Sequence, residues 1–258
     1  MAPTAATKQV VTRIPYLNCV PFFHGLKLPE GWEWCEASPR QLGQEAKAGK
    51  IFAGPLALAD FLRLDDQFER LGPFGVAVRG RCQSVMVFSK KPMRQLDGAA
   101  IAVTEETSTS ALLLRLIAEQ RYGIRPRYLP GDHPDADALL LIGDQALKAQ
   151  AGNRNFPYEV DLAFEWWLWQ HLPFVFAVWA VRKDSDAADK QLLSRELLRA
   201  FGQNSRRLDA LAVERAVALG RSAEDLTMYL EHFVYRLSQP EEDAIRVFSK
   251  LVHDHGLL

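Results

Sequence analysis

Residues 99–116 read AAIAVTEETSTSALLLRL, and this stretch decides the class of fold. Its first part, Ala99–Val103, is a short apolar run of the kind that forms a buried strand. A run of hydroxyl residues follows, and Ser108 or Thr109 is placed to cap the helix that the leucine-rich remainder predicts. The stretch therefore predicts a β-strand that leads directly into an α-helix.

The same arrangement occurs again further along the chain. Ala138–Ile142 is a second apolar strand, Gly143-Asp144 ends it, and Gln145–Gln150 fits a short helix. Further strands are predicted at Val10–Ile14, Phe74–Val78, Cys82–Phe88 and Phe174–Val181. The alternation of buried strands with helices predicts an α/β fold with parallel-sheet character.

The order of these elements favours two lobes rather than one. A compact βα region, Lys90–Pro173, lies between two strand-like runs, Val85–Phe88 and Phe174–Val178. If these runs lie side by side in opposite directions, the chain leaves one lobe, builds the second and returns, with a two-strand hinge beneath a cleft. From Lys190 onward the pattern is helical, and we expect this C-terminal tail to pack on lobe one. The expected ranges are 1–88 with 179–258 for lobe one and 89–178 for lobe two.

The composition disfavours several classes of partner. The chain has 258 residues, of which 31 are basic and 32 acidic, so its net charge of -1 offers no basic surface to nucleic acid or an anionic membrane. The longest apolar stretch, Phe174–Val181, is far shorter than the roughly 20 residues of a membrane-spanning helix. Residues 1–9 lack the apolar region of a secretory signal, which favours a cytoplasmic protein.

Cysteine and histidine patterns predict no metal site. Cys19, Cys35 and Cys82 are widely separated and lack CxxC spacing, which fits partly buried, reduced thiols. The six histidines form no HExxH or comparable pattern. No GxSxG, P-loop, GxGxxG or paired-carboxylate motif occurs, so the residues alone leave the reaction type open.

Three segments place hydroxyl or amide groups beside the predicted start of a helix. There, unpaired backbone N–H groups and the positive end of the helix dipole favour an anion. The segments are Tyr16–Asn18, Thr107–Ser110 and Gly143-Asp144. Capping needs one hydroxyl, whereas Thr107, Ser108, Thr109 and Ser110 supply four in a row. This run is therefore predicted to bind a ligand, with helix capping as the alternative.

Other candidates each have a structural alternative. Asn18 lies in an apolar segment between two prolines, and its amide offers a ligand both a donor and an acceptor, although an Asx turn or a helix cap fits equally. Asp144 also suits a helix cap, and Ser84 is an isolated hydroxyl on a strand. The tryptophans of the predicted helix Asp161–His171 are candidates for a site lining, but helical spacing places some of them in the core; they are Trp166, Trp167 and Trp169.

Four longer segments carry a family resemblance, namely RIPYLNCVPFFHGL at 13–26, VTEETSTSALLLRL at 103–116, LLLIGDQAL at 139–147 and DLAFEWWLWQHLPFVFAVW at 161–179. In order and spacing they resemble the chorismate dehydratases of the futalosine route to menaquinone, and they cover nearly the whole chain before the helical tail. That family has the type II periplasmic-binding-protein-like fold, which agrees with two lobes and a hinge.

The resemblance implies a hydro-lyase that converts chorismate into 3-(1-carboxyvinyloxy)benzoate and water, with no metal or redox cofactor. It assigns the catalytic role to Asn18, which would polarise or position the substrate. The substrate-binding residues would be Tyr16, Ser84, Thr107, Ser108, Thr109, Ser110, Gly143 and Asp144. The base is not identified by any motif, and one of the substrate's own carboxylates is a candidate for it. The sequence does not determine the oligomeric state, and a homodimer is one possibility.

Two rival functions follow from the same fold. A solute-binding protein for a small organic anion would need an export segment, which residues 1–9 do not resemble. The sister lyase of the pathway, which acts on a cyclic futalosine derivative, lacks the opening found here at Tyr16–Asn18. The chain also departs from the dehydratase pattern at Ala57 and Leu58, where relatives often have a serine, and this removes one ligand contact.

Overall fold

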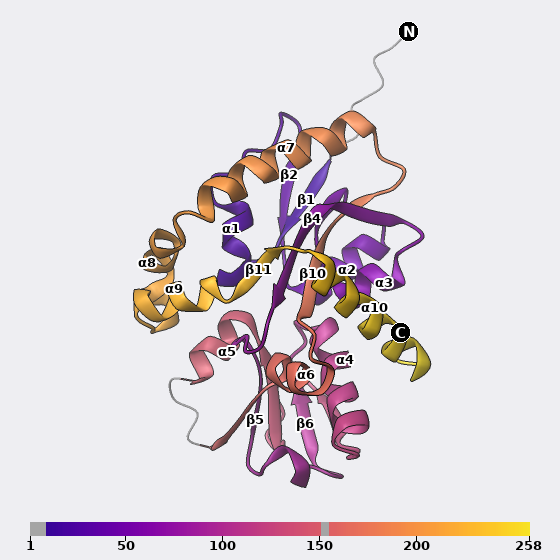
Figure 1. Ribbon diagram of the computed structural model, residues 1–258, viewed down its shortest axis with the longest axis vertical. Coiled ribbons are helices and arrows are strands. Elements are labelled where there is room, and N and C mark those ends of the chain that lie inside the picture. The colour runs from indigo at the N-terminus through magenta and orange to yellow at the C-terminus, as the bar shows by residue number, and fades with distance from the viewer. Residues whose placement is uncertain (1–8, 151–154) are drawn as a thin grey trace.

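Two β-sheets, joined by two crossing segments, form the framework of the molecule (Figure 1). This computed structural model describes residues 9–150 and 155–258. The six-stranded sheet has the order β11 (Phe233–Arg236), β4 (Phe68–Val78), β10 (Phe174–Arg182), β3 (Ala53–Ala57), β1 (Val10–Arg13) and β2 (Glu33–Glu36). The five-stranded sheet has the order β7 (Arg127–Pro130), β6 (Ala100–Val103), β8 (Ala138–Ile142), β5 (Val85–Ser89) and β9 (Tyr158–Asp161). We call the first sheet and its helices lobe one, and the second sheet and its helices lobe two.

The helices cover both sheets. Lobe one carries the 3-10 turn η1 (Leu17–Cys19) and the helices α1 (Val20–Phe23), α2 (Pro39–Lys47), α3 (Leu58–Arg63), α7 (Ala187–Asn204), α8 (Leu208–Leu219), α9 (Ala223–Glu231) and α10 (Gln239–Asp254). Lobe two carries η2 (Met93–Gln95), α4 (Thr109–Leu116), the π-helical turn η3 (Ile117–Arg121), α5 (Gly143–Gln150) and α6 (Leu162–Gln170). The predicted mixed α/β class is confirmed, because both lobes are sheets packed against helices.

The core of lobe one is built on aromatic side chains from distant parts of the chain. Phe22 of α1 has no exposed surface, and its ring lies 5.8 Å from Trp179 of β10 and 5.4 Å from Phe201 of α7. Such ring pairs stabilise a core beyond the area they bury. Because α1 directly follows η1, this packing fixes the first loop of the candidate site to the sheet.

Both βα units predicted from the sequence are present in lobe two. β6 leads through residues 104–108 into α4, and β8 leads directly into α5. β6 and β8 pair in parallel, with Ile101 opposite Ala138. The carboxyl ends of both strands therefore lie at the same edge of the sheet, which is where ligands bind in α/β sheets.

The sheets divide the chain differently from the expected ranges at both crossings. Val85–Phe88 was expected in lobe one, but the strand that contains it, β5, pairs with β8 and β9 of lobe two. Phe174–Arg182 was expected to begin in lobe two, but it pairs with β3 and β4 of lobe one from its first residue, where Phe174 lies opposite Val78. The two crossing segments are thus residues 79–84 and 171–173. The first follows the end of β4 and the second precedes the start of β10, and these two strand ends are neighbours in the sheet of lobe one. Apolar runs alone could not assign either strand to a sheet.

The C-terminal region also differs from the expected helical tail. β11 interrupts it and adds an edge strand to β4, so this region completes the sheet of lobe one as well as covering it. The last helix, α10, contacts β10 and α4, and its Phe248 ring lies 6.1 Å from Trp166 of lobe two. The tail therefore packs on lobe one and also reaches lobe two. Within residues 9–150 and 155–258, no helix has the length and apolar character required to cross a membrane.

Candidate functional site

A small inner cavity lies where the two lobes meet. Its volume is about 60 Å³, and residues from both lobes line it. All of the candidate site residues line this cavity except Asp144; those that do are Tyr16, Asn18, Ser84, Thr107, Ser108, Thr109, Ser110 and Gly143. A cavity of this size is much smaller than the roughly 300 Å³ or more of a typical small-molecule pocket, so its lining must move to admit such a ligand.

Asn18 presents an unpaired acceptor to this cavity. Its Oδ1 atom is buried and has no hydrogen-bond partner among the described residues. The side chain caps neither η1 nor α1, so the capping alternative does not account for it. A buried amide oxygen without a partner is costly to the folded protein. The arrangement is the one expected of a group that acquires its partner from a ligand.

Two of the four consecutive hydroxyls form hydrogen bonds to lobe one, and the other two have no side-chain partner among the described residues. Thr109 Oγ1 accepts from Ala59 N at 3.0 Å and donates to the carbonyl of Phe176 at 3.2 Å, while Ser108 Oγ donates to Asp60 Oδ1 at 2.8 Å. These contacts join the lobes. Thr107 and Ser110 are buried and make no side-chain hydrogen bond to any other described residue. Of the four, Thr107 and Ser110 are therefore the ones available to a ligand.

The first turn of α4 opens on the same cavity. Ser108 is its N-cap residue but makes no capping hydrogen bond with its side chain, because that hydroxyl is turned to Asp60. The alternative that this hydroxyl run caps the helix is therefore not observed, since no side chain in the described part of the chain makes a capping hydrogen bond at the start of α4. Together with the helix dipole, the first turn of α4 forms a favourable place for a carboxylate.

Ser84 is occupied by contacts within lobe one and its crossing. Its Oγ accepts from Tyr229 Oη at 2.9 Å and donates to the carbonyl of Cys82 at 3.3 Å. Since its single hydrogen is already used, Ser84 has only an acceptor to offer a ligand. Tyr229, on α9, is fully buried behind it and could not be foreseen from the sequence.

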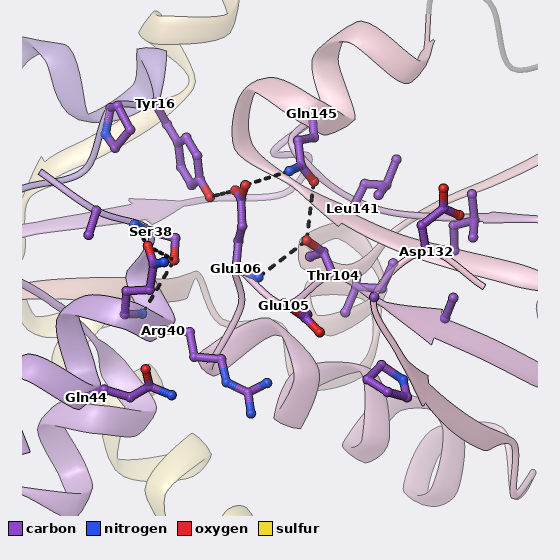
Figure 2. Close-up of a pocket in the computed structure, with 18 of the residues that line it drawn as sticks. Tyr16, Ser38, Arg40, Gln44, Thr104, Glu105, Glu106, Asp132, Leu141 and Gln145 are labelled. Carbon is purple, nitrogen blue, oxygen red and sulfur yellow. Dashed lines mark hydrogen bonds between the residues drawn. The ribbon is translucent and has the colours of Figure 1, made fainter.

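Tyr16 separates the inner cavity from a much larger outer cleft. The outer cleft measures about 1250 Å³, and Tyr16 lines both spaces. Figure 2 shows Tyr16, Glu106 and Gln145 directed toward one another. Tyr16 Oη donates to Glu106 Oε2, and Gln145 Nε2 donates to Glu106 Oε1 at 2.7 Å. Glu106 lies inside the quoted VTEETSTS segment, but nothing in that pattern assigned it a partner.

Gly143 allows the ring of Tyr16 to lie in this position. A Cβ atom at residue 143 would come within 2.5 Å of Tyr16 Cδ2, and the backbone there has a φ of 56°, which disfavours other residues. The amide of Gly143 donates to the carbonyl of Ser84 at 2.7 Å. Gly143 is thus required by close packing between the lobes.

Asp144 holds the first loop instead of lining the cavity. Its Oδ1 accepts from Leu17 N at 2.9 Å, and its Oδ2 forms an ion pair with Arg215. The prediction that Asp144 contacts the ligand directly therefore has no support from its position, because both oxygens face lobe one. The alternative, in which Asp144 caps α5, is not observed either, because its two oxygens contact Leu17 N and Arg215.

The lining of the inner cavity is nearly neutral. Among the described residues that line it, none is Asp, Glu, His, Lys or Arg. Burial raises the pKa of Tyr16 above its usual value, and the hydrogen bond to Glu106 raises it further. Burial likewise raises the pKa of Cys19, with a smaller contribution from Asp144. Both groups are therefore protonated at neutral pH, and neither is a ready base.

Other side chains considered from the sequence do not reach the cavity. Trp166 is fully buried in the core and donates from Nε1 to the carbonyl of Pro173 at 3.0 Å. No tryptophan of α6 lines either the inner cavity or the outer cleft within the described chain. No cluster of three or more His, Cys, Asp or Glu side chains in residues 9–150 and 155–258 is arranged to hold a metal ion.

Replacing Asp60 should change how stability depends on pH. Burial raises the pKa of this carboxyl, although hydrogen bonds from Ser108 and Arg63 oppose the effect, and Oδ2 has no partner among the described residues. The folded state then binds a proton more readily than the unfolded state, so stability falls as pH rises from about 4 through the raised pKa. We expect the free energy of unfolding of Asp60→Asn not to show this fall. The difference between Asp60→Asn and wild type should therefore increase in favour of the variant as the pH rises from about 4 through the raised pKa.

Urea unfolding between about pH 4 and pH 7 measures this difference. Asp66→Asn makes the same change in charge at an exposed position and serves as the control. If the difference between Asp60→Asn and wild type stays constant with pH, the raised pKa is wrong.

Comparison with known proteins shows the family to which this chain belongs. A family model described as "Menaquinone biosynthesis" matches residues 10–254. The chorismate dehydratase of Thermus thermophilus is 33% identical over 254 residues, a match that covers 91% of this chain and 92% of that protein.

Solved structures share the fold. A protein from Archaeoglobus fulgidus superposes with a TM-score of 0.78 at 19% identity, covering 99% of this chain and 100% of that one. The periplasmic aliphatic sulphonate binding protein of Escherichia coli superposes with a TM-score of 0.63 at 14% identity, covering 98% and 89%. These likenesses confirm the fold expected from the sequence, and the length of the family match shows that the chain belongs to the menaquinone-biosynthesis family.

Proposed function

We propose that this protein is a chorismate dehydratase, which removes water from chorismate to give 3-(1-carboxyvinyloxy)benzoate. The observation that carries the proposal is the inner cavity, where Asn18, Thr107 and Ser110 offer unsatisfied polar groups beside the first turn of α4. Chorismate carries two carboxylates, and such a lining binds them by hydrogen bonds and a helix dipole, without a cationic side chain. The sequence relationship to the Thermus thermophilus enzyme supports the same substrate.

The chemistry asks for little more than binding and stabilisation of charge. The C3–H bond breaks, the ring carboxylate accepts the developing negative charge through the diene, and the C4–O bond then breaks. The proton and the leaving hydroxide depart as water, and the ring becomes aromatic. Donors placed around the developing charge lower the barrier to the first step. The Nδ2 group of Asn18 supplies a donor for this purpose, and its unpaired Oδ1 accepts from the ring hydroxyl, while Thr107, Ser110 and the first turn of α4 hold a carboxylate.

We infer that a carboxylate of the substrate itself takes the proton. Tyr16 and Cys19 are the titratable side chains among the described residues that line the inner cavity, and burial raises the pKa of each. Neither is a useful base at neutral pH. A carboxylate held close to C3 would act intramolecularly, which is an effective arrangement for proton transfer.

Incubation of the purified protein with chorismate tests the proposal. We expect conversion to the aromatic ether, followed by absorbance and mass spectrometry, at a rate that depends on protein concentration. Binding of chorismate without turnover would favour the solute-binding alternative. Turnover of a cyclic futalosine derivative in place of chorismate would favour the sister lyase. The cytoplasmic location and the homodimer considered from the sequence remain predictions.

A further inference from the structure

The loop that carries Asn18 is held from both sides by contacts with an arginine and an aspartate. Arg215 of α8 donates from Nη2 to the carbonyl of Pro15 at 3.1 Å and forms an ion pair with Asp144. Asp144 of α5 accepts from Leu17 N at 2.9 Å. The backbone on both sides of Tyr16 is therefore fixed, and Asn18 is the next residue along.

This group of contacts crosses the interface between the lobes. Arg215 and the loop belong to lobe one, whereas Asp144 belongs to lobe two, and α5 and α8 are in contact. The side chains of Arg215 and Asp144 retain 30% and 16% of their exposure, so water screens the pair only in part. Separation of the lobes would deprive Leu17 N of its carboxylate partner, because Asp144 lies on α5 of lobe two.

We propose that Arg215 and Asp144 are positioning residues, which set the orientation of Asn18 as the lobes close. Neither residue lines the inner cavity, so both act through the loop at residues 15–18. The inference rests on the proposed function in one respect, namely that Asn18 contacts the substrate. Closure then completes the site at the moment when the substrate is enclosed.

A double-mutant cycle tests this coupling. We expect Arg215→Ala to lower kcat by roughly 10-fold to 100-fold, as misplacement of a catalytic group by about 1 Å does. In an Asn18→Ala background the same substitution should change kcat by less than about twofold, because the group that Arg215 positions is already gone. An equal loss in both backgrounds would show that Arg215 acts through general stability, and would overturn the proposal.

Arg221 offers a matched control. It also links the segment after α8 to α5 across the lobes, by donating to Gln150 Oε1 at 3.0 Å, but it does not touch the loop at residues 15–18. We expect Arg221→Ala to leave kcat within about twofold of wild type. A loss equal to that of Arg215→Ala would assign the effect to lobe contact in general and overturn the specific role.

Hydrogen exchange at the Leu17 amide tests the anchoring of the loop separately from the proposed chorismate dehydratase function. Exchange should be faster in Arg215→Ala than in wild type and unchanged in Arg221→Ala, whether or not chorismate is turned over. Unchanged exchange in Arg215→Ala overturns the positioning role by itself. If exchange is faster in Arg215→Ala but the wild-type protein does not convert chorismate, the proposed function is refuted and the anchoring of the loop by Arg215 still holds.

Discussion

Asn18→Ala should lower kcat on chorismate by about 10²–10³, the loss that follows removal of one group aimed at developing charge. Asn18→Asp should be impaired further and should raise KM, because it places a negative charge beside a substrate that already carries two. Steady-state kinetics with detection of the aromatic product measures both effects. Near-normal turnover in both variants would remove Asn18 from the mechanism.

The stability of Asn18→Ala provides the control for this experiment. Asn18 Oδ1 is buried and has no partner among residues 9–150 and 155–258, so its removal deletes an unsatisfied polar atom instead of a hydrogen bond. We therefore expect the melting temperature to stay the same or rise while kcat falls. A fall in both would mean that the loss of activity reflects unfolding.

Asp161→Ala should lower the free energy of unfolding by more than about 3 kcal/mol. Its Oδ2 accepts from the amides of Cys82 and Gln83, each at 2.8 Å, in the first crossing segment. Its Oδ1 accepts from two amides in the first turn of α6, those of Ala163 and Phe164. The alanine variant leaves this buried set of donors without an acceptor. Gln83, whose φ is 60°, would also lose a contact that holds its unusual backbone.

Urea unfolding of three variants measures the contribution of Asp161. Asp161→Asn keeps one acceptor oxygen and should fall between wild type and Asp161→Ala. Ser222→Ala removes an exposed helix cap whose Oγ accepts one hydrogen bond from Asp225 N, and it should cost about 1 kcal/mol. If Asp161→Ala costs no more than Ser222→Ala, the crossing is not held by this carboxylate.

The sequence was sufficient for the local elements and for the hydroxyl and amide side chains that line the cavity. Strands such as Ala138–Ile142 are continuous apolar runs, and the hydroxyl run at 107–110 is conspicuous because capping does not need four hydroxyls. These signals lie within a few residues of one another. They predicted the edge of the sheet at which the cavity is found and the family to which the chain belongs.

The features that the sequence did not reveal depend on partners far apart in the chain. Asp161 meets Cys82, and Asp144 meets Arg215, through contacts that no local pattern encodes. The boundaries of the lobes were misplaced for the same reason, since strand pairing and not hydrophobicity assigns Val85–Ser89 to its sheet. That Ser108 has a side-chain partner, whereas Ser110 has none among the described residues, could likewise be recognised only after Asp60 had been placed.

The pairing of Val78 with Phe174 has a consequence for how the molecule is organised. β4 and β10 are neighbouring antiparallel strands, and residues 79–173 connect the end of one to the start of the other. These residues are therefore an insertion at the tip of what is topologically a long β-hairpin. A tight turn between Val78 and Phe174 would leave that sheet's strand order intact. It would also remove Thr107, Ser110 and α4, so the chemistry of the cleft belongs to the inserted segment as much as to its host.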